Sequence, residues 1–277
     1  MDRQKEIAIR QLVRTNFRSF AEWLRTRHVS EVDNPDGVIN SKRKNVFIAE
    51  LWAEFMMYSA LVRSFDSSLW NILEDLWNAV WRLSYQTFED GISSYLYPWQ
   101  SNKIEELINV YSTDSDNRVA PSVSDYETYT CIVPRNRDSF ARFHETDNYF
   151  YDTENRIHYL IELKAGWNVD VKKAPWEKRE LLIEYFMLKN KLELENRGEE
   201  TIKIKFATAY NKDWEWNFRN QSSVRNCFAD EELLIGRDYW NFICNDPDWF
   251  DVIISEYRNS AQNIRDALQE IVDAYTH

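Results

Sequence analysis

The chain has 277 residues, a formal net charge of −12, and a composition that is 44% hydrophobic and 15% aromatic. This length and apolar content suit one large domain or two small ones with a sizeable core. No run of 18 apolar residues occurs, so we expect no transmembrane helix and no membrane partner. The three cysteines are widely spaced and the N-terminus lacks an apolar signal segment, which together predict a cytoplasmic protein with reduced thiols.

The negative charge is unevenly distributed along the chain. Residues 227–277 carry three Lys/Arg against eleven Asp/Glu, whereas residues 1–45 carry ten against six. A strongly acidic protein does not bind nucleic acid indiscriminately. A basic cleft on an acidic body is compatible with a specific, salt-sensitive DNA complex.

Helical patterns dominate the first part of the chain. Residues 2–27 have the apolar spacing of one helix, and residues 44–64 and 68–88 predict two packed helices that are apolar over most of their surfaces and therefore buried. We assign residues 1–112 to a helical N-terminal portion for support or dimerisation within the same domain. Residues 113–277 are predicted to form an α/β catalytic core with C-terminal helices. The expected fold class is α/β, with a mixed central sheet flanked by helices.

A hairpin is predicted near the middle of the chain. Residues 146–151 and 158–164 are apolar, aromatic and β-branched, as expected for strands. The polar segment 152–156 between them is rich in turn-forming residues. We predict a register in which Tyr151 lies opposite Ile157.

This register brings two acidic residues together. Asp147 lies opposite Ile161 and therefore beside Glu162, at about 5–7 Å for opposed and diagonal neighbours. Glu162 and Lys164 share one strand face because side chains alternate across a sheet. Mg²⁺ is bound by one or two carboxylates and keeps several waters. We therefore predict Asp147 and Glu162 as catalytic metal ligands, the Leu163 carbonyl as a further ligand, and Lys164 as the residue that orients a water or neutralises a phosphate.

The acid-x-Lys triplet by itself is not specific. It occurs twice, as Glu162-Leu163-Lys164 and as Asp170-Val171-Lys172, roughly as often as chance predicts in this composition. The strand context and the acid at hairpin spacing favour the first triplet. The alternative is a solvated strand face with an incidental ion pair.

Two segments are predicted to contact DNA. A helix begins near Pro175, which suits a first turn, and basic residues surround this start, where helix amides bind phosphate. The segment 210–226 places Asn, Gln and Arg between tryptophans, and these side chains read base edges in the major groove. A solvated helix start and an ordinary polar loop are the alternatives. The predicted DNA-binding residues are Asn168, Lys172, Lys173, Lys178, Arg179, Asn211, Lys212, Asn217, Arg219, Asn220, Gln221 and Arg225.

Glu50 and Glu54 are further candidates for the metal site. They lie four residues apart in an apolar helical segment. A buried, unpaired carboxylate is costly, so a metal ion or an arginine would explain them. One exposed helix face that carries both residues explains them equally well.

The chain resembles the TdeIII-type family of type II restriction endonucleases. The resemblance covers about residues 44–275 and is carried by Thr146-Asp147, by Tyr159-Leu160-Ile161-Glu162-Leu163-Lys164, by the helix start 173–182, and by Glu232-Leu233-Leu234-Ile235-Gly236-Arg237-Asp238-Tyr239-Trp240-Asn241-Phe242. It implies a restriction-endonuclease-like PD-(D/E)XK fold, Mg²⁺ dependence, and cleavage of double-stranded DNA at a short palindromic site, GGNCC-like in some members. The chain departs from the family pattern after Lys164, where Ala165-Gly166 stands, and in having Thr-Asp for Pro-Asp.

These observations lead to one hypothesis and two alternatives. We expect a homodimeric restriction endonuclease that hydrolyses DNA by metal-activated water, with a cognate DNA methyltransferase as its functional partner. A repair or recombination nuclease would share the metal site without sequence specificity. A non-enzymatic helical interaction protein would carry the triplet by accident.

Overall fold

The computed structural model of the chain describes residues 3–88, 91–112, 119–129, 142–146, 148–166, 173–211 and 222–276. Its contacts form two compact units. The helical unit comprises residues 1–83 and 243–277, and the sheet unit comprises residues 84–242. The chain therefore enters the sheet unit once and returns to the helical unit, and these units do not follow the predicted division at residue 112.

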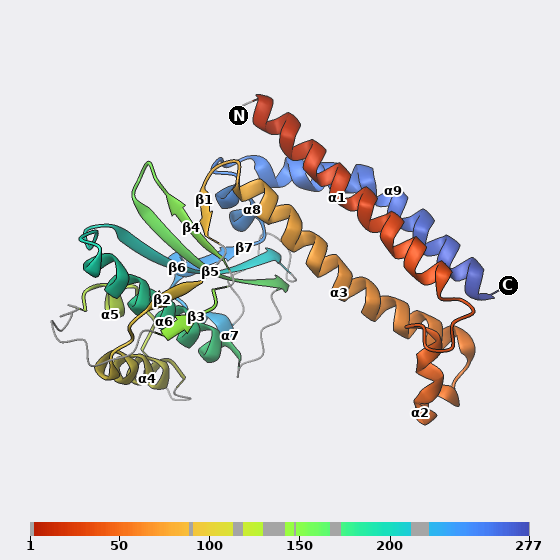
Figure 1. Cartoon of the computed structure of the whole chain (residues 1–277), viewed down its shortest axis with the longest axis horizontal. Coiled ribbons are helices and arrows are strands. Elements are labelled where there is room, and N and C mark those ends of the chain that lie inside the picture. The colour runs from red at the N-terminus through yellow and green to blue at the C-terminus, as the bar shows by residue number, and fades with distance from the viewer. Residues whose placement is uncertain are drawn as a thin grey trace. The chain divides into compact units, whose positions relative to one another are not determined.

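The helical unit is built on three long helices. Its elements are α1 (Arg3–Ser30), η1 (Asn40–Lys44), α2 (Val46–Ala49), α3 (Ala53–Trp81) and α9 (Trp249–Thr276). The helices α1 and α9 run side by side (Figure 1). Arg10 and Arg14 of α1 both donate hydrogen bonds to the buried carboxylate of Glu256 in α9. The predicted helix over residues 2–27 is confirmed as α1.

The prediction of two buried helices over residues 44–64 and 68–88 is wrong in two respects. Residues 53–81 form the single helix α3, because this stretch contains no glycine or proline that would end it. Several large apolar side chains before and along α3 are exposed: Phe47 by 84%, Trp52 by 67% and Val62 by 58%.

The sheet unit contains a five-stranded mixed sheet. Its strands are β1 (Gln86–Phe88), β4 (Tyr149–Asp152), β5 (Ile157–Gly166), β6 (Thr201–Tyr210) and β7 (Leu233–Ile235), in the order β1-β4-β5-β6-β7. The pairs β1–β4 and β4–β5 are antiparallel, whereas β5–β6 and β6–β7 are parallel. A second sheet pairs β2 (Ile92–Ser94) with β3 (Arg142–His144). The other elements are α4 (Pro98–Ser112), α5 (Ser124–Glu127), α6 (Lys173–Leu194), α7 (Ser222–Arg225), η3 (Asp230–Glu232) and α8 (Arg237–Ile243). The prediction of a mixed sheet flanked by helices is confirmed.

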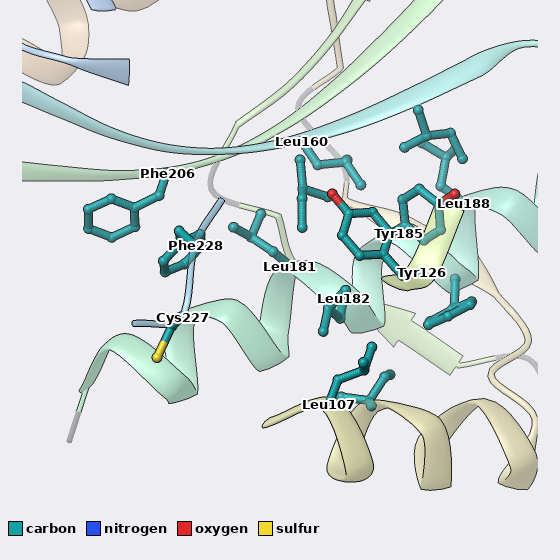
Figure 2. Packing of buried hydrophobic residues seen from close by; sticks show 14 of the residues in the cluster. Leu107, Tyr126, Leu160, Leu181, Leu182, Tyr185, Leu188, Phe206, Cys227 and Phe228 are labelled. Atoms are coloured by element: carbon teal, nitrogen blue, oxygen red, sulfur yellow. The ribbon is translucent and has the colours of Figure 1, made fainter. Parts of the chain in front are cut away.

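Helix α6 connects β5 to β6 and covers one face of the large sheet. Leu160 of β5 points toward Leu181, Leu182 and Tyr185 of α6 (Figure 2). Along β5 the alternate residues Ile161 and Leu163 are buried as well, so the strand is covered on both faces. The start of α6 is thereby held beside the end of β5 that carries the predicted site.

In the described part of the chain, no helix has both the length and the apolar content needed to cross a membrane.

Candidate active site

Three charged side chains meet where β5 approaches the start of α6. Lys164 forms an ion pair with Glu162, two residues before it on the same strand face. Its Nζ also lies 3.2 Å from Oε1 of Glu177 in α6. We call these three residues the Lys164 trio. The predicted shared face of Glu162 and Lys164 is confirmed, and Glu177 is a member that sequence reasoning missed.

Glu177 could have been found from the connection between the elements. In a strand–helix–strand crossover, the start of the helix lies near the carboxyl end of the preceding strand. Glu177 stands in the second turn of α6, which follows β5 directly. In the sequence, the basic residues at this helix start are more conspicuous than Glu177.

Burial distinguishes the Lys164 trio from a solvated strand face. The side chain of Glu162 is 9% exposed, that of Glu177 is 13% exposed and that of Lys164 is 35% exposed. A carboxylate this buried is costly without a partner, and the ammonium of Lys164 supplies one. The alternative of a solvated face with an incidental ion pair does not fit these exposures.

The charge state of Lys164 follows from its surroundings. Partial burial lowers the pKa of its ammonium, but the hydrogen bond and the charge of Glu162, together with Glu177, outweigh burial and raise this pKa above its ordinary value. Lys164 is therefore protonated at neutral pH. The trio thus contains two acidic side chains and one ammonium.

Asp147 lies outside the described residues, but both of its neighbours are described and buried. Asn148 accepts a hydrogen bond at its carbonyl from the N–H of Ile161, at 2.9 Å, and Thr146 is 9% exposed. Asn148 is thereby held next to the β5 segment that carries Glu162.

The predicted hairpin register is wrong by one residue. Tyr151 lies opposite His158, and Asp152 lies opposite Ile157. Asp152 is the last residue of β4 rather than the first of the turn, because its Oδ1 accepts hydrogen bonds from the N–H groups of Glu154 and Asn155. The turn therefore begins after Asp152.

Seven of the twelve predicted DNA-binding residues lie outside the described residues, and five lie within them. Those outside the described residues are Asn168, Lys172, Lys212, Asn217, Arg219, Asn220 and Gln221. Lys173 is exposed at the first position of α6, and Arg225 is exposed near Asp230. Arg179 forms an ion pair with Glu105 and lies over the ring of Trp176. Asn211 is only 8% exposed.

The prediction that Lys178 contacts DNA is corrected by its burial. Its side chain is fully enclosed and forms an ion pair with Glu232, which is 1% exposed. The hydroxyl of Tyr126 donates to Oε1 of Glu232 at 2.6 Å, and the N–H of Ala229 donates to Oε2 at 2.7 Å. This buried ion pair lies in the packing between α6, α5 and η3. A phosphate cannot reach the ammonium of Lys178 there.

Glu50 and Glu54 do not have the buried setting that motivated their prediction. Glu50 ends α2 and Glu54 begins the first turn of α3, so the helix is interrupted between them. Both side chains are exposed. The alternative of an exposed setting describes both residues. Their membership of the metal site stays a prediction.

The histidine of the hairpin is structural. His158 is 1% exposed, and both ring nitrogens are hydrogen-bonded: Nδ1 to the hydroxyl of Tyr149 at 2.9 Å and Nε2 to Glu200 at 2.8 Å. Burial lowers the pKa of its imidazole despite the carboxylate of Glu200.

In the described part of the chain, no group of three or more His, Cys, Asp or Glu residues is arranged to hold a metal ion. A lysine held between acidic residues at a strand end, beside a helix start, is suited to phosphodiester hydrolysis, which indicates a nuclease.

A comparison with protein families supports the assignment to the nucleases and narrows it to one family. The family described as "Type II restriction endonuclease, HinfI" matches residues 8–260. The chain belongs to this family and is a type II restriction endonuclease, a hydrolase that cleaves DNA at specific sites. Enzymes of this class generally use a divalent metal ion. No curated protein and no solved structure matches the chain.

Proposed function

We propose that the chain is a Mg²⁺-dependent endonuclease of the PD-(D/E)XK kind that cleaves double-stranded DNA at a short palindromic site. The observation that carries this proposal is Lys164 held between Glu162 and Glu177 at the carboxyl end of β5. Family membership supports site-specific DNA cleavage and disfavours both a non-enzymatic role and an unspecific repair nuclease. The TdeIII-type resemblance and a GGNCC-like target remain predictions within this class.

The donor set around Lys164 fits Mg²⁺. This ion prefers carboxylate and carbonyl oxygens and retains several waters. Glu162 and Glu177 supply carboxylates, and Asp147 is the proposed additional one. Thr208, the register partner of Lys164, carries a buried Oγ1 with no hydrogen-bond partner among the described residues. A hydrated ion would satisfy this hydroxyl through one of its waters.

The backbone direction of β5 supports the proposed Leu163 ligand. The N–H of Ile161 bonds to Asn148, so the polar groups of Ile161 point to the β4 edge of the strand. Backbone groups alternate between the two edges along a strand. The carbonyl of Leu163, two residues further, therefore points to the same edge, on which Asn148 is found.

Each side chain has a defined part in the proposed reaction. When bound, Mg²⁺ supplies an acidified water and stabilises negative charge on the scissile phosphate. Lys164 enters as a cation, because its two carboxylate partners raise its pKa. It donates hydrogen bonds to the attacking water or to a phosphate oxygen and does not act as a general base. Glu162 and Glu177 hold its ammonium in place.

A palindromic target implies two active sites related by a two-fold axis. We therefore propose a homodimer, and a cognate methyltransferase that protects the host target as its functional partner. Lys173, Arg179 and Arg225 are the described candidates for backbone or base contacts, with the undescribed residues of 212–221 as proposed readout residues.

The test is a digest of diverse unmethylated DNA with the purified full chain and Mg²⁺, followed by sequencing of the ends. The expected result is discrete fragments with one shared terminal sequence, lost with EDTA and in Glu162→Gln and Asp147→Asn. Glu154→Gln, an identical change at an exposed residue of the same hairpin, should cut like the wild type. Intact DNA, or fragments with random ends, would overturn the proposal.

A further inference from the structure

Thr208 of β6 carries a buried hydroxyl on the face of the sheet that holds the Lys164 trio. Thr208 is the register partner of Lys164, and Phe206, two residues before Thr208, is the register partner of Glu162. Side chains two residues apart on a strand share a face, and Phe206 lies on the same side of the sheet as Leu160, which points toward α6 (Figure 2). The hydroxyl of Thr208 therefore lies beside Lys164, on the face that α6 covers.

The surroundings of this hydroxyl are apolar except on the side of Lys164. Thr208 is 0% exposed, and its Oγ1 has no hydrogen-bond partner among the described residues. Its register partner on β7 is Ile235, a buried apolar residue, and Phe206 precedes it on the same face of β6. Its register partner on β5 is Lys164. An unpaired buried hydroxyl lowers the stability of a protein, so its presence beside Lys164 needs a reason other than stability.

Lys164 has the complementary hydrogen-bonding capacity. Its ammonium has three N–H donors, and Glu162 and Glu177 account for two of them within the described part of the chain. A water next to the third N–H accepts a hydrogen bond from Lys164 and can donate one to Oγ1 of Thr208. A DNA phosphate cannot contact Thr208 in this way, because the threonine is fully buried whereas the side chain of Lys164 is 35% exposed.

We infer that Thr208 is a further positioning residue for DNA cleavage, and that its hydroxyl orients the attacking water that Lys164 holds. Two fixed hydrogen bonds leave the water with one direction in which a lone pair faces the phosphorus, and such orientation lowers the activation barrier. β6 pairs with a strand on each side, so the backbone of Thr208 is fixed. No covalent bond to Thr208 forms or breaks.

The inference rests on the proposed function, because it places the reaction at Lys164. It also goes beyond that proposal, which leaves two roles open for Lys164. A hydroxyl that is closed to DNA but adjacent to Lys164 selects the water, and not a phosphate oxygen, as the group that this lysine orients.

The experiment compares Thr208→Val with Thr208→Ser. Valine keeps the shape of threonine without the hydroxyl, and serine keeps the hydroxyl without the methyl group. Thr208→Val should slow single-turnover cleavage by about 10- to 100-fold, while its midpoint of denaturant unfolding equals or exceeds that of the wild type, because an unpaired buried hydroxyl is removed. Thr208→Ser should cut at close to the wild-type rate although its unfolding midpoint falls, because the lost methyl group leaves a cavity. A purely structural role does not move activity and stability in opposite directions.

Two controls accompany these variants. The substrate is the shortest DNA fragment that the wild type cuts once with Mg²⁺, and its dissociation constant in EDTA, measured by fluorescence anisotropy, should be equal for the wild type and both variants. Ser94→Ala is the matched control for removal of a hydroxyl. The Oγ of Ser94 is also buried without a partner among the described residues, but it lies on β2 of the second sheet. Ser94→Ala should cut like the wild type.

Four results would overturn the inference. These are wild-type cleavage by Thr208→Val, equally slow cleavage by Thr208→Ser, a loss of DNA affinity that accounts for the slower cleavage, and a marked loss of stability in Thr208→Val, which would show that the hydroxyl is paired.

Lys164→Met separates this inference from the proposed function. Slow cleavage by Lys164→Met together with wild-type cleavage by Thr208→Val would remove the role of Thr208 and leave the proposed site standing. Wild-type cleavage by Lys164→Met would remove the proposed site, and the role of Thr208 with it.

Discussion

Glu177 and Lys178 are adjacent in α6 but belong to two different ion pairs, with Lys164 and Glu232 respectively. The two pairs differ in burial, and that difference separates a structural role from a chemical one. Lys178 is fully buried and pairs with one carboxylate, Glu232. Lys164, on β5, is 35% exposed and is shared between Glu162 and Glu177. Burial lowers the pKa of Lys178, whereas two carboxylates raise the pKa of Lys164 against the effect of burial.

The two ion pairs differ in the functions that are open to them. Tyr126 and Ala229 complete the hydrogen bonding of Glu232. The buried Lys178–Glu232 pair therefore has no access to solvent or to a ligand, and its role is to stabilise the fold. The side chain of Lys164 is 35% exposed, so a molecule in solution can reach it.

Lys178→Met should lower the free energy of unfolding by about 3–5 kcal/mol, because it leaves the Glu232 carboxylate buried without a counter-charge. Denaturant unfolding measures this loss. The double variant Lys178→Met/Glu232→Gln should recover part of it, since the unpaired charge is then gone. Lys173→Met, at the exposed start of the same helix, should change stability by less than about 0.5 kcal/mol. An unfolding midpoint of Lys178→Met equal to the wild type would contradict a structural role.

Lys164→Met should lower the rate of DNA cleavage by about 100- to 1,000-fold, the usual effect of removing one positioned charge or donor from an active site. Its effect on stability should be much smaller than that of Lys178→Met, because Glu162 can then be stabilised by water or a metal ion. The measurement is single-turnover cleavage together with denaturant unfolding. If Lys164→Met unfolds as readily as Lys178→Met and the folded fraction still cuts, the two lysines have the same role.

Glu177→Gln should lower cleavage by about tenfold, a loss of about 1.4 kcal/mol of transition-state stabilisation. Lys164 loses one of two charged acceptors but keeps Glu162 and a neutral amide oxygen. Glu193→Gln, an exposed change further along the same helix, is the control for the kinetic assay. Wild-type rates in Glu177→Gln would show that the contact with Lys164 is incidental.

His158 is a buried residue whose contribution to the free energy of unfolding depends on pH. Burial lowers the pKa of its imidazole, so below the unfolded pKa of about 6.5 the unfolded chain binds a proton that the folded chain does not. The stability that this residue contributes is therefore present above that pH and is lost as pH falls, by up to about 1.4 kcal/mol per pH unit.

The measurement is urea unfolding between pH 7.5 and 5.5, compared with His158→Gln. The wild type should lose more stability than the variant over this range. Because His144 gains a proton more readily in the folded state, beside Glu184, the difference between the two proteins is the informative quantity. An identical pH dependence in both would show that His158 is not held neutral.

Much of the fold was predictable because local patterns dominate it. The apolar stripe of α1, the β-branched run of β5 and the proline near the start of α6 each identify their element correctly. The hairpin was also predictable, but not its register. One side chain, Asp152, moved the turn by a residue through hydrogen bonds to two backbone amides. Composition does not distinguish a turn residue from a strand residue that caps the turn.

The candidate site was predictable only in part. Glu162 and Lys164 are two residues apart, so strand alternation alone places them on one face. Glu177 and Lys178 are adjacent in the sequence, and both look like polar residues of a solvated helix start. Their partners lie on β5 and at the end of η3, far along the chain. Only the packing of α6 against the sheet separates their roles.

Sequence patterns are therefore sufficient to predict the local features: helices from apolar stripes, strands from alternation, and the acid-x-Lys pair on one strand face. These depend on neighbours within a few residues. Only the folded structure shows which charged side chains are buried and paired, that α3 continues past Ser64, and that Phe55, Tyr58 and Val62 of α3 are exposed. Burial and ion pairing depend on residues that lie elsewhere in the sequence. Desolvation is strong enough that two lysines of the same chain have different roles.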